Sequence, residues 1–174
     1  MLLSKSRRSR SGTTLLEVLV TAAVCAIFFT SIFEVNAVCL RLINSSKENV
    51  AALECVQDRL EQLRNLSFAN LVDTPGLTAL LTTPPNSSSL PFKATETVTI
   101  RKFANGAATT PTVTFLRGPG ASVSPSHSPN PGGAVDFTGV NLVRVDVTYN
   151  WTTTFGAIAH QETTSTIISE GAKK

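Results

Sequence analysis

Apolar residues follow two different periods along the chain, and the change of period divides it into a helical and a β-rich region. Residues 13–74 contain neither Pro nor Gly, whereas all nine Pro lie at position 75 or later. Pro and Gly are the strongest helix breakers. The first region therefore predicts one long helix over residues 13–70, and residues 71–174 are expected to form a separate head with Pro-, Gly- and Ser-rich loops.

The start of this helix is apolar enough to cross a membrane. Between Leu15 and Phe33 the only charged residue is Glu17. A helix over residues 13–33 would be about 31 Å long, which matches a bilayer core of about 30 Å. Residues 13–36 are therefore expected to be transmembrane, and the apolar residues of this span include Leu15, Leu16, Val18, Leu19, Phe28, Phe29 and Phe33.

The second half of the helix carries an apolar stripe with three- and four-residue spacing, which marks one face of an amphipathic helix. We expect Cys25 and Cys39 to behave as small apolar helix residues and Cys55 to be the most solvent-exposed cysteine. The stripe has fewer than three clean heptads, which favours a helix packed on a sheet over a coiled coil. The stripe is formed by Val50, Leu53, Val56, Leu60, Leu63 and Leu66, and the other sides carry Asp58, Arg59, Glu61 and Arg64.

After residue 75 the period changes to two, which is typical of β-strands. The third alternating segment places Val143, Val145, Val147, Tyr149 and Trp151 on one face, which should cover the apolar stripe. A hairpin turn at residues 152–156 would make the last two strands antiparallel neighbours. The predicted fold class is α+β, with a long N-terminal helix packed on a small antiparallel sheet like a lollipop. The predicted strands are 96–103, 111–117, 140–151 and 157–169.

The remaining residues offer little for catalysis or metal binding. Residues 74–95 and 117–139 are predicted loops, the second with four Pro and five Gly. That loop has one carboxylate, Asp136, too few for a calcium site. His127 and His160 lie far apart, and no Cys or carboxylate cluster has metal-ligand spacing. We therefore expect no enzymatic activity, no metal or other cofactor, and no small-molecule substrate.

The basic character of the chain is concentrated at its N-terminus. Residues 1–12 contain four cations and no acid, while the other eleven cations nearly balance the twelve acids. Direct nucleic-acid binding is therefore not expected. By the positive-inside rule, the basic segment keeps the N-terminus in the cytoplasm and places the head outside it. The four cations are Lys5, Arg7, Arg8 and Arg10.

Other targeting segments agree less well with these residues. A cleaved secretory signal requires a small-x-small site, and the region around Ala22 provides only a poor one. A lipoprotein signal would place a small residue before the modified cysteine, but Val24 precedes Cys25. An uncleaved signal anchor fits the length and leaves Glu17 unexplained.

Glu17 is the unusual residue of the span. An ionised side chain in an apolar span costs about 2.5–3.5 kcal/mol, and the next cation along the helix, Arg41, is 24 positions away. A cut after Gly12 would create a cationic α-amino group on Thr13, which could reach Glu17 of a neighbouring copy. Glu17 therefore predicts a contact between chains.

These residues resemble the N-terminus of type IV prepilins and of the pseudopilins of type II secretion. The signature is a short basic leader ending in Gly, a cut, and an apolar helix with Glu five residues after the Gly; here MLLSKSRRSRSG precedes TTLLEVLVTAAV. Most members carry Phe where this chain has Thr13. The V-x-V-x-Y-x-W strand ending at Trp151, followed by a Thr-rich strand, is similar to minor pilins and to the minor pseudopilin I.

The resemblance implies a pilin-like fold and a defined processing pathway. A prepilin peptidase would remove residues 1–12 by cutting between Gly12 and Thr13, and would N-methylate Thr13. An inner-membrane assembly platform would then take the subunit from membrane lipid into a filament of pilin or pseudopilin subunits, where Glu17 pairs with the Thr13 amine of a neighbour. The filament would lie in the periplasm or on the cell surface.

Two questions remain open at this point. The resemblance does not distinguish a pilus from a secretion pseudopilus or a DNA-uptake fibre, nor a major from a minor subunit. The alternative to a filament subunit is a signal-anchored extracytoplasmic β domain whose binding function is unrelated to filaments.

Overall fold

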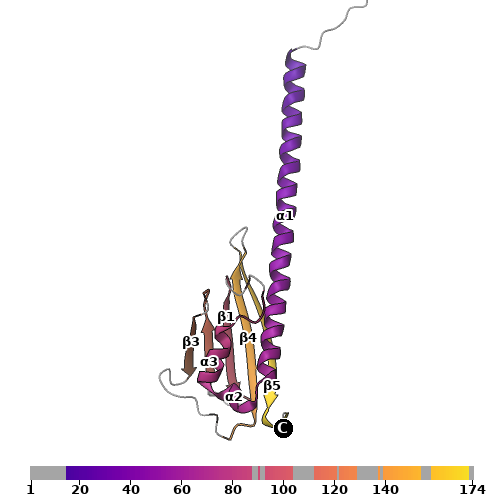
Figure 1. Ribbon diagram of the computed structural model, residues 1–174. Coiled ribbons are helices and arrows are strands. Elements are labelled where there is room, and N and C mark those ends of the chain that lie inside the picture. Colours follow the sequence, from indigo (N-terminus) through magenta and orange to yellow (C-terminus); the bar gives the residue numbers. More distant parts are fainter. Residues whose placement is uncertain are drawn as a thin grey trace, which may run out of the picture. The chain divides into compact units, whose positions relative to one another are not determined.

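The computed structural model describes residues 15–87, 90, 93–103, 112–120, 122–128, 137, 139–153 and 158–172. The chain divides into two compact units, the first ending at Ile43 and the second starting at Asn44. Helix α1 (Leu15–Asn65) contributes to both units. Its first part makes up the described portion of the first unit, and its last part belongs to the second unit together with all the strands (Figure 1).

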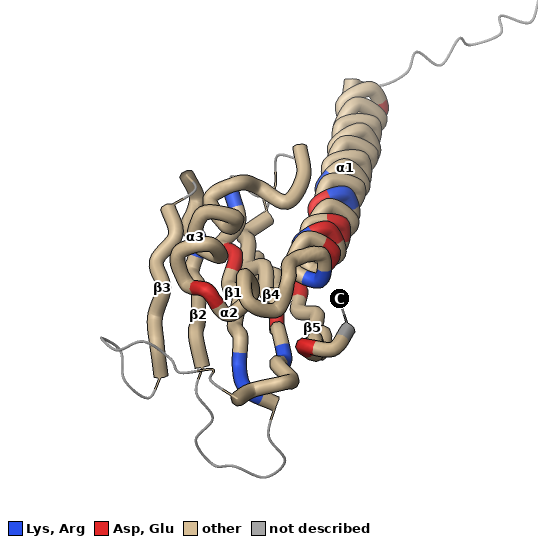
Figure 2. Tube along the Cα trace, turned by 60° about the horizontal axis from the view of Figure 1, so that its bottom comes forward, with Lys and Arg blue, Asp and Glu red and all other residues tan. Residues whose placement is uncertain are grey.

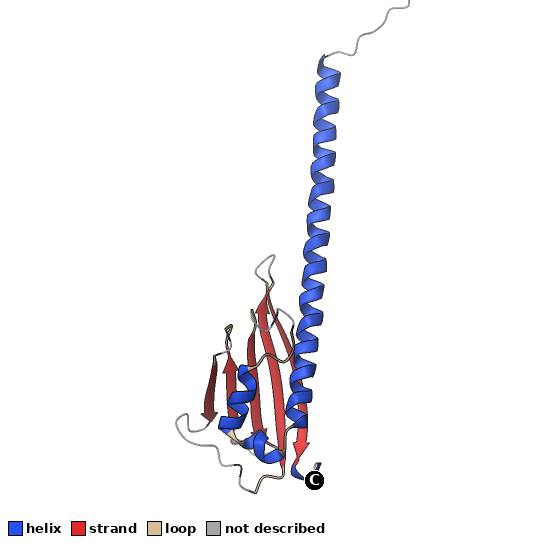
Figure 3. Ribbon diagram, in the orientation of Figure 1, coloured by secondary structure: helices blue, strands red, loops and turns tan. Residues whose placement is uncertain are grey.

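The second unit is built on a five-stranded sheet in the order β3-β2-β1-β4-β5, in which all neighbours are antiparallel (Figure 3). Four of these strands were predicted from the alternation of apolar and polar residues, and those predictions are confirmed. The strands are β1 (Thr95–Lys102), β2 (Thr112–Arg117), β3 (Val123–Ser128), β4 (Leu142–Thr152) and β5 (Ala159–Ser169).

The part of α1 within the second unit packs on one face of this sheet. Val56, Leu60 and Leu63 of α1 belong to the same buried cluster as Val143, Val145, Val147, Tyr149 and Trp151 of β4. The β4 face predicted to cover the helix therefore does so. The α+β fold class, with a long N-terminal helix packed on an antiparallel sheet, is confirmed.

The segment between α1 and β1 is more helical than its composition predicted. α1 ends at Asn65 rather than at residue 70, and two short helices follow, α2 (Phe68–Val72) and α3 (Thr74–Thr82). The carboxylate of Asp73 caps α3 by accepting a hydrogen bond of 3.0 Å from the Gly76 amide. Pro75 therefore falls in the first helical turn, where its missing N–H is not needed. The loop predicted over 74–95 is wrong for residues 74–82.

The Pro- and Gly-rich segment 117–139 was also predicted to lack regular structure, and this is wrong for β3. Pro125 and His127 both lie in β3, which pairs with β2 at the edge of the sheet. An edge strand tolerates Pro because it has a side that does not need N–H donors. The turn between β2 and β3 uses Gly120 with a φ of +97°, a conformation that favours glycine.

The buried face of α1 differs from the predicted stripe. Val50 and Leu53 are 57% and 43% exposed, whereas Cys55 and Arg59 have no exposed surface. The prediction that Cys55 would be the most solvent-exposed cysteine is wrong, as is the placement of Arg59 on the polar side. The reason is an ion pair between Arg59 and Glu96 of β1, which turns this side of the helix toward the sheet.

Candidate functional site: the apolar segment of α1

The apolar side chains of α1 in the first unit are exposed among the residues that the structure describes. The large apolar side chains between Leu15 and Ile43 range from 48% exposed, at Ile32, to 83% exposed, at Leu15. Soluble monomers rarely leave a contiguous apolar surface of this extent uncovered. The surface includes all seven residues assigned to the span from sequence: Leu15, Leu16, Val18, Leu19, Phe28, Phe29 and Phe33.

This segment meets the physical requirements for a membrane span. α1 is the one helix in the described part of the chain that is long and apolar enough to cross a bilayer, and its most apolar 18-residue window is entirely unburied. Figure 2 shows an uncharged stretch of α1 after the acidic residue near its start. The segment is therefore compatible with a single-pass membrane anchor near the N-terminus.

Hydroxyl groups inside the segment are satisfied by the helix itself. Thr21 donates to the backbone carbonyl of Glu17 at 2.7 Å, and Thr30 and Ser31 make the same bond to the carbonyls four residues earlier, at 2.8 and 2.9 Å. Such bonds let Ser and Thr enter an apolar environment without an unsatisfied donor. Within the described part of α1, no hydrogen bond to the carboxylate of Glu17 is found.

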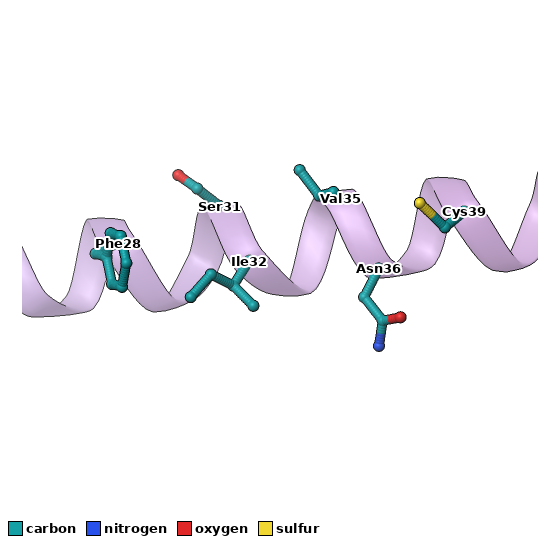
Figure 4. A pocket seen from close by; sticks show the side chains of 6 residues that line it. All are labelled: Phe28, Ser31, Ile32, Val35, Asn36 and Cys39. Atoms are coloured by element: carbon teal, nitrogen blue, oxygen red, sulfur yellow. The ribbon is translucent and has the colours of Figure 1, made fainter.

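A hollow on the apolar segment is open to its surroundings and not an enclosed pocket. It is lined by Phe28, Ser31, Ile32, Val35, Asn36 and Cys39, all of which belong to α1. Figure 4 shows these six side chains projecting from one length of helix. A single helix cannot enclose a ligand, so the hollow offers packing space for lipid chains or for side chains of another helix.

Glu17 lies at the start of the described helix and is exposed. Its side chain borders a second shallow hollow with Val18, Thr21, Ala22 and Cys25. The salt bridges among the described residues do not include Glu17. Gly12 and Thr13, the predicted cleavage and methylation positions, lie outside the described residues.

The head contains a buried charge cluster that the sequence pattern did not reveal. Nε of Arg59 lies 2.5 Å from Oε1 of Glu96, and Nη1 of Arg117 lies 3.5 Å from Oε2 of the same carboxylate. Burial, and then the nearby charge of Glu96, raise the pKa of Tyr149 well above its usual value of 10.0. A signal did exist in the sequence, because Glu96 and Arg117 alternate in phase with apolar residues of their strands, Val98 and Phe115.

Other polar groups of the head have structural roles. Arg144 and Arg101 both bind Asp146, with an Nε to Oδ1 distance of 2.8 Å for Arg144. His160 stacks on Trp151, with ring centroids 5.6 Å apart. Among the described residues there is no group of three His, Cys, Asp or Glu side chains that could hold a metal ion.

Comparison with known proteins found no match to a protein family, to a curated protein or to a solved structure. A functional proposal therefore rests on the chain's own residues: the basic residues 1–12, the exposed apolar part of α1 and Glu17 within it.

Proposed function

We propose that this chain is a prepilin-like structural subunit, of the minor class, that assembles into a type IV pilus or a type II secretion pseudopilus through the N-terminal part of α1. The observation that carries the proposal is Glu17, an exposed carboxylate in a helix segment whose large apolar side chains are also exposed. It stands five residues after Gly12, at the end of a leader with four cations.

A filament core would cover the exposed apolar side chains of α1 and would give the Glu17 carboxylate a cationic partner. Packing between copies of α1 covers the apolar side chains, and a cut after Gly12 supplies an α-amino group on Thr13 for a neighbour's Glu17. Apolar contacts alone hold helices together without fixing how far one is shifted along the other. A buried charge pair penalises wrong shifts, because it leaves a charge stranded in a low-dielectric bundle.

The proposal assigns partners and a location. A prepilin peptidase acts on Gly12 and Thr13, and residues 13–36 then hold the subunit in the lipid of the inner membrane, with the head outside the cytoplasm. An inner-membrane assembly platform and other pilin or pseudopilin subunits complete the set of partners. The four leader cations support this orientation.

Substitution of Glu17 tests the proposal in cells that assemble the filament. We expect Glu17→Ala to enter the membrane normally and to be absent from sheared or purified filaments, because the new amine of its neighbour loses its partner. Glu34→Ala is the matched control, since Glu34 is the next acidic residue of α1 and is also exposed. Normal incorporation of Glu17→Ala into filaments would refute the proposal.

A further inference from the structure

Apolar packing does not by itself fix the position of α1 along the sheet. Its buried residues Ala52, Val56, Leu60 and Leu63 repeat every three or four positions. A shift of one helical turn would bring Ala52 to the place of Val56, and Val56 to the place of Leu60, so these central sites would stay apolar. The same shift would carry Glu48 and Arg59 into the buried places of Ala52 and Leu63. The central apolar contacts therefore do not select one register, and the selection falls to the charged residues that a shift would move.

The ion pair between Arg59 and Glu96 supplies such a feature. Besides the 2.5 Å contact of Nε with Oε1, Nη2 of Arg59 lies 3.1 Å from Oε2, so the pair is bidentate, and neither side chain is exposed. A one-turn shift would place Cys55 or Leu63 opposite Glu96. Neither residue carries a positive charge to replace the guanidinium.

Residues 83–86, which precede β1, form hydrogen bonds with the same side of α1. Nη2 of Arg59 donates to the carbonyl of Thr83 at 2.8 Å, and the Gln62 amide donates to the carbonyl of Pro85 at 3.0 Å. The Asn86 amide donates to Asp58 at 2.8 Å. All three bonds would break in a shifted register, so they support the selection made by the ion pair.

We propose that Arg59 and Glu96 form a register lock, which allows residues 44–65 of α1 to seat on the sheet in one position only. A buried polar contact that selects register among similar apolar alternatives is the best-supported role for such pairs. The lock concerns the head alone, so its test does not depend on filament assembly.

Asn86 provides a reporter of register, because its Oδ1 lies 3.5 Å from Sγ of Cys55. With Cys25→Ala and Cys39→Ala as background, Asn86→Cys replaces the side chain that contacts Cys55 by a second thiol, so the two can form a disulfide in the observed register. In a second chain, Ala51→Cys and Cys55→Ala are added to Asn86→Cys. A disulfide between positions 51 and 86 then reports a shift of one turn. The disulfides are formed by mild oxidation of the full chain in detergent and read by mass spectrometry of peptides.

Moving the cation tests the lock directly. In the chain with Ala51→Cys and Asn86→Cys, Cys55→Arg together with Arg59→Met should shift α1 by one turn. Glu48→Ala is included because position 48 would then occupy the buried place of Ala52. We expect the disulfide from position 51 to increase at least about tenfold over the chain that retains Arg59. Arg117→Met is the matched control, because it removes a buried cation of the same cluster from β2 and should leave this disulfide yield unchanged.

Fluorescence of Trp151, the single tryptophan, shows whether each variant is folded. A folded variant with the relocated cation that still lacks the disulfide from position 51 would overturn the lock. Failure of this variant to fold, while Arg117→Met folds, would overturn it as well, since a cation one turn away should allow seating in the shifted register.

Discussion

Tyr149 of β4 lies directly opposite Glu96 of β1 in the sheet register, and both side chains are completely buried. Burial, and then the charge of Glu96, raise the pKa of the Tyr149 hydroxyl above its usual value of 10.0. The phenol is therefore held neutral in the folded head, next to a carboxylate that pairs with two arginines. This relationship predicts a measurable response to alkaline pH.

The folded protein should keep Tyr149 protonated at a pH where the unfolded chain ionises. Its contribution to stability is full below about pH 10 and is lost as the pH rises from there toward the folded pKa, at about 1.4 kcal/mol per pH unit. Because the chain has one tyrosine, tyrosinate absorbance follows this residue alone. Tyr149→Phe should remove this part of the alkaline stability loss. Equal titration midpoints in folded and urea-unfolded protein would contradict the prediction.

Removing the guanidinium of Arg59 should strongly destabilise the head. Arg59→Ala leaves Glu96 with one cation, Arg117 at 3.5 Å, and breaks the hydrogen bonds to Gln62 and Thr83. We expect the free energy of unfolding to fall by about 3–5 kcal/mol, measured by urea denaturation in detergent with Trp151 fluorescence. Arg64→Ala, on an exposed position of the same helix, should change it by less than about 0.5 kcal/mol. Similar decreases in the free energy of unfolding for both variants would show that the Arg59–Glu96 ion pair does not stabilise the head.

Two leucines of α1 differ in burial, so the same substitution at each tests which face of the helix contacts the sheet. Leu63 is fully buried, whereas Leu53, which lies on the same predicted stripe, is 43% exposed. Leu63→Ala should lower the free energy of unfolding by about 2–5 kcal/mol because it leaves a cavity between α1 and the sheet. Leu53→Ala should cost less than about 1 kcal/mol. Equal losses, measured in the same denaturation experiment, would mean that the helix seats on the sheet through a different face.

The sheet was the most predictable part of the fold. Alternating Val and Thr mark strands because one face of each strand is buried, and this local signal located β1, β2, β4 and β5. The short helix α3 was missed because Pro75 and Gly76 resemble a stop signal when the capping carboxylate of Asp73 is overlooked. β3 was missed because Pro and Gly dominate its surroundings.

Local periodicity marks only the strand residues of the charge cluster, Glu96 and Arg117. Glu96 alternates in phase with the buried apolar residues of β1, but Arg59 looks like a solvent-facing residue of α1 until its partner, 37 positions away, is known. The candidate assembly segment is the opposite case, because its apolar length and the isolated Glu17 are local features. The expected partner of Glu17 belongs to another chain, so a single chain contains only one half of that contact.

The central claim is that this chain is processed after Gly12 and then assembles through Thr13 and Glu17. The most direct test is the intact mass of the protein extracted from membranes of cells that contain the assembly system. The account predicts a chain that lacks residues 1–12 and carries one added methyl group on Thr13. A full-length chain with an unmodified N-terminus would contradict it and would identify the segment as an uncleaved membrane anchor.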